Sequence, residues 1–287
     1  MWWYNKNMSI TIKEIQYRLI VHGYKVDADG LDGPETQQAI IDFQKKNRLY
    51  ADGLVGKITT AKLLESPDTV SSGAVKLKLV KVACDKYGDG YDKTTLREDA
   101  GKDFQKVVDE AHSLGGIITS AGGLRSLNTS AGASQSKTSL HYTGLAHDLA
   151  VYSGMVDPNK DPYVVSKITI DGKAGWNVSA RGNNTLPLTK IKAYTFKHQE
   201  IEVEGHFFSL TEVFRKNGFK PISPRKSFFG AKRDDLSAEF WHFSYERALL
   251  PMVSTFGGEL LKIYTIKELE KYKLWDYRGF IWKKDWF

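Results

Sequence analysis

The stretch Ser139-Leu-His141-Tyr-Thr-Gly144-Leu-Ala146-His147-Asp148 and the later Glu239-Phe-Trp241-His242 decide how this chain must fold. Together the two segments can supply two imidazoles and one carboxylate as metal ligands, and one further carboxylate. Three protein ligands leave the fourth position of a zinc ion open to water, and an unligated Glu can take the proton of that water. We therefore expect the fold to bring the two segments together at a hydrolytic zinc centre.

The local geometry of these segments restricts which side chains can meet. If the segment around Asp148 is a strand, His147 and Asp148 point to opposite faces, because side chains alternate along a strand. Only one of the two can face a shared site. His141 precedes them across a turn at Gly144, which lets the chain reverse and brings His141 beside Asp148. His242 must then arrive from another strand.

The composition of the 287-residue chain, with 41% hydrophobic and 26% charged residues, is that of a globular protein with one large or two unequal domains. Its only cysteine, Cys84, excludes an intramolecular disulfide and a cysteine-based zinc site. The net charge of +7 suits a polyanion such as nucleic acid, an anionic membrane or a cell-wall polymer. No basic run marks a nucleic-acid-binding surface, so we expect no nucleic-acid partner.

Neither a membrane span nor a secretion signal is expected. No stretch approaches the roughly 18 apolar residues of a transmembrane helix. The first seven residues, Met1-Trp-Trp-Tyr-Asn-Lys-Asn, lack the apolar core of a signal peptide. We therefore expect no stable membrane insertion. We also expect that the protein is made in the host cytoplasm without a signal peptide.

Residues 1–65 contain an internal repeat, in which Asp29-Gly-Leu-Asp-Gly-Pro-Glu-Thr36 is echoed by Asp52-Gly-Leu-Val-Gly-Lys-Ile-Thr59. Each copy is typical of a tight glycine turn that leads into a helix. Apolar residues at helical spacing lie before and between the copies. They are Ile12, Ile15, Leu19, Ile20, Ala39, Ile40 and Phe43. We expect three short helices in a small bundle.

With Phe43-Gln44 on the helix between the two turns, this segment resembles the repeat-containing peptidoglycan-binding domain over about residues 9–65. The resemblance implies that the module binds peptidoglycan. A helical module that serves only folding or docking is the alternative. The pattern does not single out the polar residues that would contact the wall.

The rest of the chain predicts an interdomain linker over residues 66–80 and an α+β domain with a small antiparallel sheet over 81–250. Helices are expected over 97–114 and 208–217, and strands over 115–120, 145–152, 164–170 and 193–196. Residues 251–287 form an aromatic, basic C-terminal extension. It is interpreted as a half-buried β-hairpin, with stacking on sugars or contact with a membrane surface as the alternative.

The pattern Ser-x-His-x-x-Gly-x-Ala-x-Asp, followed by Glu-x-x-His with Trp before the His, resembles the zinc D-alanyl-D-alanine metallopeptidase family. This family includes VanX-like dipeptidases, VanY-like carboxypeptidases and L-alanyl-D-glutamate endopeptidases of phages and bacteria. The resemblance implies a zinc ion, Zn2+, held by His141, Asp148 and His242, with Glu239 as the catalytic base. Ser139 and Trp241 match the family as supporting positions.

Arg125, in Thr119-Ser-Ala-Gly-Gly-Leu-Arg125-Ser126, matches a family segment that ends a strand with an Arg close to the metal. The resemblance implies that its guanidinium binds the scissile carbonyl oxygen or a substrate carboxylate. His147 is expected off the site, in a structural or surface role. His206 is placed at a helix start, as a minor candidate for substrate contact. Residues 151–205 are interpreted as an insertion that shapes substrate choice or decorates the surface.

These resemblances predict a monomeric, zinc-dependent peptidoglycan peptidase whose wall-binding module holds the catalytic domain on its insoluble polymer. We expect a bacteriophage endolysin that cuts an L-alanyl-D-glutamate or D-alanyl bond and acts on the wall, in the periplasm, after release from the host cytoplasm. One alternative is a D-alanyl-D-alanine carboxypeptidase that remodels the wall. The other is a non-catalytic wall-binding component of a phage or secretion apparatus.

Overall fold

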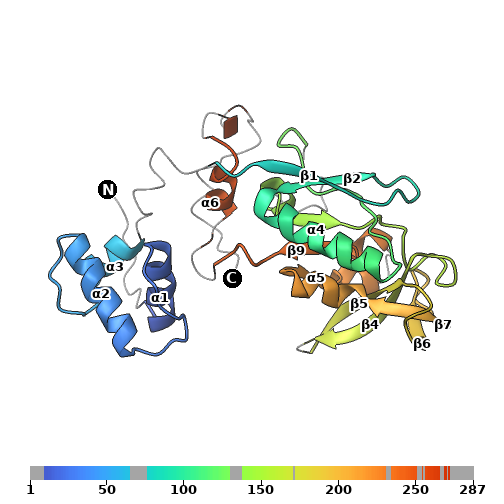
Figure 1. The fold of residues 1–287 in the computed structure, drawn as a ribbon, viewed down its shortest axis with the longest axis horizontal. Helices are drawn as coiled ribbons and strands as arrows, with labels where there is room; N and C mark the ends of the chain where they lie inside the picture. The colour runs from blue at the N-terminus through green and yellow to red at the C-terminus, as the bar shows by residue number, and fades with distance from the viewer. Residues whose placement is uncertain are drawn as a thin grey trace. The chain divides into compact units, whose positions relative to one another are not determined.

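The structure is a computed structural model that describes residues 10–64, 76–129, 138–170, 172–230, 234–250, 254, 256–265, 268–269 and 271. The chain divides into two compact units, one with the helices of residues 10–64 and one with Leu77–Ala248. Helices and small antiparallel sheets both occur (Figure 1). The predicted α+β class is therefore confirmed.

The N-terminal unit contains α1 (Ile12–Val21), α2 (Pro34–Lys46) and α3 (Lys57–Leu64). Thr11 caps α1 through a capping box with Glu14, and Pro34 occupies the first turn of α2. All three helices contribute to one hydrophobic core, which is formed by Ile15, Leu19, Ala39, Ile40, Phe43 and Leu63. The apolar spacing read from the sequence therefore identified the buried faces of α1 and α2, whereas Leu63 of α3 was not predicted.

Each of the repeated Asp-Gly turns is held by one buried glutamine. At the second turn, the amide nitrogen of Gln44 donates to Asp52 Oδ1, Leu54 O and Thr59 Oγ1 at 3.1, 2.9 and 3.3 Å. Its amide oxygen accepts from the backbone of Gly53 at 2.9 Å. Gln44 is fully buried, so its amide must find hydrogen-bond partners within the protein. The polar groups of the turn provide them.

Gln16 makes the same set of contacts at the first turn. Its amide nitrogen donates to Asp29 Oδ1, Leu31 O and Thr36 Oγ1 at 2.8, 2.9 and 3.0 Å, and its oxygen accepts from Gly30 at 2.8 Å. The hallmark residues of the repeat therefore hold the turns together. The same pattern of hydrogen bonds therefore occurs at both copies of the sequence repeat.

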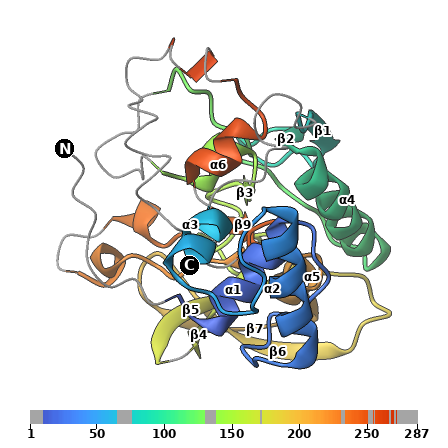
Figure 2. The same cartoon turned by 90° about the vertical axis from the view of Figure 1, so that its left-hand side faces the viewer.

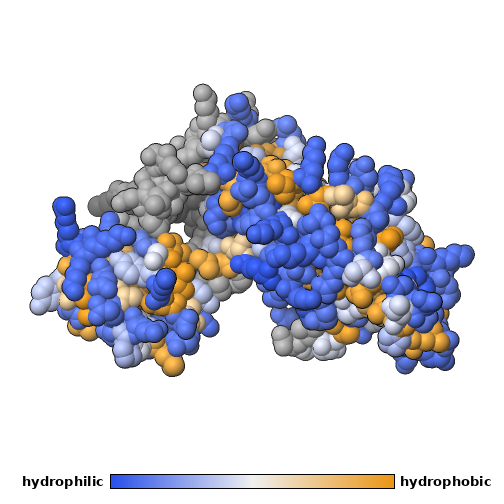
Figure 3. Space-filling view, in the orientation of Figure 1, coloured by the Kyte–Doolittle hydropathy of each residue, from blue (hydrophilic) through white to orange (hydrophobic). Residues whose placement is uncertain are grey.

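In the second unit, β1 (Leu79–Ala83) and β2 (Lys93–Arg97) form an antiparallel pair, and α4 (Glu98–Ser113) lies alongside it in both ribbon views (Figures 1 and 2). Phe104, Val107, Val108 and Ala111 form the buried face of α4. Its outward face is polar, and Figure 3 shows this face as a hydrophilic surface. This amphipathic pattern is why the predicted helix over 97–114 is confirmed almost to the residue.

Two further sheets follow α4 in the chain. β3 (Ala146–Asp148), β9 (His242–Tyr245) and β8 (Phe219–Pro221) form an antiparallel sheet in that order. β4 (Tyr163–Ile170), β5 (Lys173–Arg181), β7 (Glu200–Ser209) and β6 (Leu188–Tyr194) form a second one. α5 (Leu210–Lys216) follows β7, and α6 (Phe256–Leu261) lies near the C-terminus. The predicted insertion over 151–205 therefore contains most of a four-stranded sheet.

The predicted strand over 115–120 is wrong. Residues 116–120 join no sheet, and other groups satisfy their backbone. Ile118 O and Ser120 O accept from the backbone of Asp85 and Tyr91 at 2.7 Å each, and Thr119 N donates to the Tyr163 hydroxyl at 2.9 Å. A short apolar run signals burial, and this segment is buried without being part of a ladder.

Three other predicted boundaries shift. The strand expected over 193–196 is the end of β6, which runs from Leu188 to Tyr194. The strand expected over 145–152 is limited to the three residues of β3. The helix expected over 208–217 begins at Leu210, because Phe208 still belongs to β7 and the Ser209 side chain caps the helix. Gly218 follows with a positive φ of 86°, the left-handed conformation in which glycine commonly ends a helix.

Arg97 is a fully buried charge beside the loop that carries His141. Its guanidinium donates to both carboxylate oxygens of Asp99, at 2.8 and 2.7 Å, and to Glu259 in α6 at 2.6 Å. Its backbone N–H donates to Gly144 O at 2.9 Å. A buried ion needs this degree of pairing. The contacts connect the C-terminal helix with the turn that follows His141.

Residues 251–287, interpreted as a β-hairpin, lie mostly outside the described residues, and the described part contains the helix α6 rather than a strand. Among the residues that the structure does describe, no helix is both long and apolar enough to cross a bilayer.

Replacing Gln44 by Leu should loosen the N-terminal unit. The change leaves the buried backbone N–H of Gly53 without its acceptor and removes the donor to Leu54 O and Thr59 Oγ1, at a cost of about 2 kcal/mol. Amide hydrogen exchange in α2 and α3, measured by mass spectrometry on the full chain, should then become about 30-fold faster. The control Gln38→Leu changes an exposed side chain of the same helix and should leave exchange unaltered. Equal exchange in both variants would contradict the assigned role of Gln44.

Candidate metal centre

The centre is built on the pairing of two strands. In the antiparallel pair β3–β9, Asp148 lies directly opposite His242. Directly opposed residues on neighbouring strands project from the same face of the sheet. The Oδ1 atom of Asp148 accordingly lies 2.8 Å from Nδ1 of His242. Residues distant in sequence therefore meet as a cross-strand pair, and His242 does arrive from another strand, as expected.

His141 reaches this pair from a one-turn 3-10 helix, Leu140–Thr143, which Gly144 ends in the left-handed conformation with φ of 68°. A Cβ atom at Gly144 would lie only 2.8 Å from the backbone nitrogen of Arg97, so the turn requires glycine. It places Nε2 of His141 3.0 Å from Asp148 Oδ2 and 3.2 Å from His242 Nδ1. The predicted reversal of the chain at Gly144 thus brings His141 beside Asp148.

Hydrogen bonds outside the cluster fix how His141 presents its nitrogens. Its Nδ1 lies 2.5 Å from Gly123 O. A carbonyl oxygen only accepts, so Nδ1 carries the hydrogen, and in the neutral ring Nε2 presents a lone pair. That lone pair faces the carboxylate of Asp148, which also only accepts. Two facing acceptors need a positive charge between them, either a proton or a metal ion.

His242 is oriented in a similar way. Its Nε2 lies 3.1 Å from Ser244 Oγ, a hydroxyl that can accept its hydrogen and leave Nδ1 free to bind a metal. The ligand atoms of His141, Asp148 and His242 all lie within 4.8 Å of one another. Tetrahedral zinc with bonds of about 2.0–2.1 Å needs donors about 3.3 Å apart, close to the 2.8–3.2 Å found here. The donor set therefore fits zinc.

The charges of the cluster oppose the effect of burial. Burial raises the pKa of Asp148, but the two imidazoles of His141 and His242 outweigh it and hold that pKa far below its usual range. Burial lowers the pKa of His141, but the Asp148 carboxylate outweighs it, so the net pKa is raised. The cluster therefore attracts positive charge, as a protonated imidazole or as a cation.

His147 lies on the opposite face of β3, as the alternation predicts. It is fully buried, with Nδ1 3.2 Å from Thr94 Oγ1 and Nε2 3.1 Å from Thr119 O. Its ring packs on Phe104 with centroids 4.4 Å apart. Burial lowers its pKa to about 3, so the ring stays neutral. His147 is thus a core residue outside the cluster.

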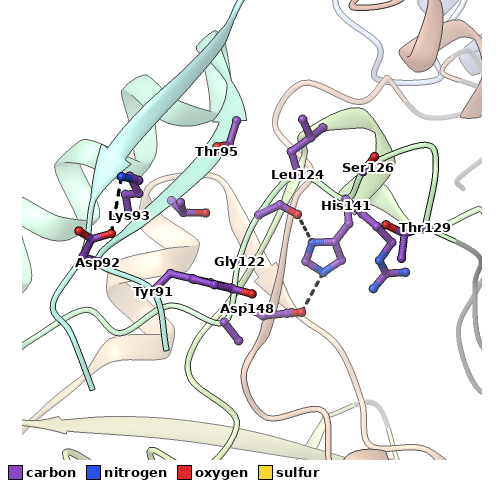
Figure 4. Close-up of a pocket in the computed structure, with 14 residues that line it drawn as sticks. Tyr91, Asp92, Lys93, Thr95, Gly122, Leu124, Ser126, Thr129, His141 and Asp148 are labelled. Carbon is purple, nitrogen blue, oxygen red and sulfur yellow. Dashed lines mark hydrogen bonds and ion pairs between the residues drawn. The ribbon is translucent and has the colours of Figure 1, made fainter. Parts of the chain in front are cut away.

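A cleft of about 420 Å³ opens beside the cluster, with His141, Asp148 and Arg125 among its lining residues. Figure 4 shows Tyr91 and Lys93 on one side of the cleft and His141 on the other. The backbone N–H of Arg125 donates to His141 O at 3.0 Å, and its guanidinium lies 5.3 Å from the centre of the Tyr142 ring. The structure therefore places Arg125 next to the cluster.

Glu239 is 7% exposed and adopts a φ of 57°, which is rare for a residue other than glycine. Its Oε1 lies 2.5 Å from the Arg225 guanidinium, and its carbonyl accepts from His242 N at 3.1 Å. Ser139 caps the 3-10 helix by accepting from His141 N at 3.4 Å. Trp241 is buried, with its ring 5.1 Å from that of Phe240.

The prediction that His206 begins a helix is wrong. It lies within β7, and its Nδ1 donates to Leu186 O at 2.6 Å. Three partners of the predicted residues were not predicted from the sequence: Gly123 contacts His141, Ser244 contacts His242 and Arg225 contacts Glu239. Ser244 could have been predicted, because it lies two residues after His242 and side chains two apart in a strand project from the same face. Gly123 and Arg225 carry no comparable signal.

The positive φ of Glu239 predicts that glycine affects stability in opposite directions at positions 239 and 238. Both Glu239→Gly and Glu239→Ala remove the carboxylate, but only alanine retains the cost of positive φ. We expect the glycine variant to be more stable by about 1 kcal/mol in urea unfolding. Ala238→Gly is the control, because Ala238 has helical dihedrals and glycine should destabilise there. A Glu239→Ala variant at least as stable as Glu239→Gly would show that the backbone at position 239 is not strained.

Zinc should stabilise the protein more strongly as the pH rises. Because the pKa of His141 is raised in the folded state, protonation of His141 stabilises the metal-free protein. This stabilisation is complete below the ordinary pKa of 6.5 and is lost as the pH rises through the folded pKa. Zinc competes with that proton and gains affinity over the same range. The zinc-induced increase in Tm should therefore grow from about pH 6 to about pH 8. Thermal unfolding of metal-stripped protein with and without zinc measures it, and His141→Ala should show no zinc effect. A pH-independent increase would contradict the assignment.

Comparisons with known proteins agree with both parts of the chain. The family model described as a peptidoglycan binding domain matches residues 10–63. The chain is also similar to the zinc D-Ala-D-Ala carboxypeptidase of Streptomyces albus G, with 28% identity over 148 residues. The match covers 50% of this chain and 58% of that protein, so the chain spans little more than half of its relative's length. No solved structure matches the chain at a significant level. The predicted resemblance to zinc D-alanyl-D-alanine peptidases with a peptidoglycan-binding domain is confirmed.

Proposed function

We propose that this protein is a zinc-dependent peptidase that cleaves a peptide bond in bacterial peptidoglycan. The observation that carries the proposal is the cluster of His141, Asp148 and His242, whose three ligand atoms converge within 4.8 Å. The similarity to a zinc D-Ala-D-Ala carboxypeptidase supports the same chemistry. Peptidoglycan as the partner is supported by the family match over residues 10–63.

We assign the catalytic roles from the family pattern that these residues match. A zinc ion held by His141, Asp148 and His242 would supply Lewis-acid chemistry and lower the pKa of water to about 7. Glu239 would take the proton of the attacking water and return it to the leaving amine. Arg125 would stabilise the negative charge that develops on the scissile carbonyl oxygen. Ser139 and Trp241 would support the loop and the strand that carry the ligands.

We propose that residues 1–65 form the wall-binding domain, 66–80 the linker, 81–250 the catalytic domain and 251–287 an extension. A bound module keeps a tethered peptidase near its insoluble substrate, which raises the effective substrate concentration. A monomer is sufficient for this arrangement, and nucleic acid has no part in it. The pairing of a wall-binding module with a peptidase suits a bacteriophage endolysin with L-alanyl-D-glutamate or D-alanyl endopeptidase activity.

A D-alanyl-D-alanine carboxypeptidase is the second candidate, because the similar Streptomyces albus G protein bears that name. The two activities leave different products. A carboxypeptidase releases one terminal D-Ala from each stem peptide, whereas an endopeptidase cuts within the stem or crosslink. A non-catalytic wall-binding component would release neither product, and the retained Glu239 argues against it.

Mass spectrometry of digested muropeptides tests the proposal and identifies the bond. Wild-type protein should release peptide products in the presence of zinc, and a chelator should abolish the release. Glu239→Gln should keep zinc but lose activity by about 100-fold to 10,000-fold, because general acid–base catalysis contributes in that range. His141→Ala should lose both the metal and the activity.

The matched control is Glu212→Gln, which neutralises an exposed carboxylate in α5. It should retain both zinc and activity. A fully active Glu239→Gln would refute its role as the base. Chelator-resistant cleavage would refute the zinc mechanism.

A further inference from the structure

Glu239 sits in a loop whose conformation is imposed from outside. Its positive φ is unfavourable for a side chain with a Cβ atom, so surrounding contacts must maintain it. Its carboxylate is also largely buried, at 9% exposure of the side chain. A buried, strained carboxylate three residues before a metal ligand is a group that the fold holds in one orientation.

Arg225 holds this loop at two points. Its guanidinium lies 2.5 Å from Oε1 of Glu239, and its backbone N–H donates to Ser237 O at 2.9 Å. The Ser237 hydroxyl also lies 2.7 Å from that of Ser227, near the start of the same segment. Side chain and backbone of Arg225 therefore fix both the carboxylate and the chain that leads to it.

Trp176 holds the loop from the other side. This β5 residue is 1% exposed, and its indole N–H donates to Ala238 O at 2.6 Å. The Ala238 carbonyl belongs to the rigid peptide unit that ends at the Cα atom of Glu239. A fixed orientation of this unit therefore sets the position from which the Glu239 side chain departs. The Trp176 ring is itself held against Phe228, with centroids 5.8 Å apart.

These contacts give the four-stranded sheet a function. We propose that Trp176 and Arg225 are positioning residues, through which the inserted sheet and residues 225–230 clamp Glu239 with one oxygen on Arg225 and Oε2 directed to the reacting water. The inference rests on the proposed function. It replaces surface decoration as the interpretation of the insertion.

The test measures kcat, KM and zinc content with soluble muropeptides. Arg225→Ala should lower kcat by about 10- to 100-fold, the loss expected when a reacting group is misplaced by about 1 Å, while KM and zinc content stay unchanged. Guanidinium added at millimolar concentration should restore part of kcat, and Arg225→Lys should be less impaired. Trp176→Phe should lower kcat in the same way, without rescue by guanidinium. Arg215→Ala, which breaks an exposed ion pair with Glu212 in α5, is the control and should behave as wild type.

The outcomes separate the alternatives. A rise in KM with unchanged kcat would show that Arg225 binds substrate, and loss of zinc or of the fold would show a general structural role. Either result overturns the clamp, as does an unchanged enzyme. Rescue by guanidinium distinguishes positioning from a folding defect, because a small cation can replace the missing charge but cannot refold the chain.

A second measurement does not depend on activity. In nuclear magnetic resonance spectra of the full chain, the Trp176 indole N–H, assigned from its loss in Trp176→Phe, should exchange slowly with solvent. Arg225→Ala should shift this signal and accelerate its exchange, and Arg215→Ala should not. If wild-type protein cleaves no muropeptide, the proposed function fails, and these spectra still decide whether the clamp exists. An indole signal unaffected by Arg225→Ala would overturn the clamp even in an active enzyme.

Discussion

The cross-strand pairing of Asp148 with His242 is the constraint on which the rest of the site depends. In an antiparallel ladder, a shift of one residue would turn every side chain of β3 to the other face. Such a shift would place His147, rather than Asp148, opposite His242. The burial of His147 against Thr94 and Thr119 opposes this shift, because the imidazole fills a site that suits a neutral ring. The core thus fixes the register that the cluster needs.

Much of this arrangement could be predicted from the sequence, because short-range rules govern it. Alternation along β3 separated His147 from Asp148, and Gly144 marked the reversal that brings His141 back. The periodicity of α4 located its buried face. The repeated Asp-Gly turns located the helices that follow them. Each of these predictions uses a spacing of a few residues, and local stereochemistry determines such spacings.

The predictions that failed or were missing concern partners distant in sequence. The residues over 115–120 are apolar enough for a strand, but their backbone partners come from Asp85, Tyr91 and Tyr163. His206 was assigned to a helix because the extent of β7 depends on its pairing with β6. Arg225 has no motif, and only the folded chain places it on Glu239. No local pattern encodes a contact that tertiary packing alone creates.

The ion pair between Arg97 and Glu259 has a consequence for how the protein matures. The two residues are 162 positions apart, and the backbone of Arg97 bonds to the turn after His141. During synthesis, Arg97 therefore emerges from the ribosome long before its buried partner does. Asp99 pairs with one side of the guanidinium early, but until Glu259 arrives, burying Arg97 leaves its Nη1 group without an acceptor, which disfavours closure of the core around the His141 turn. The cluster of His141, Asp148 and His242 is thus completed only after the residues around Glu259 have left the ribosome.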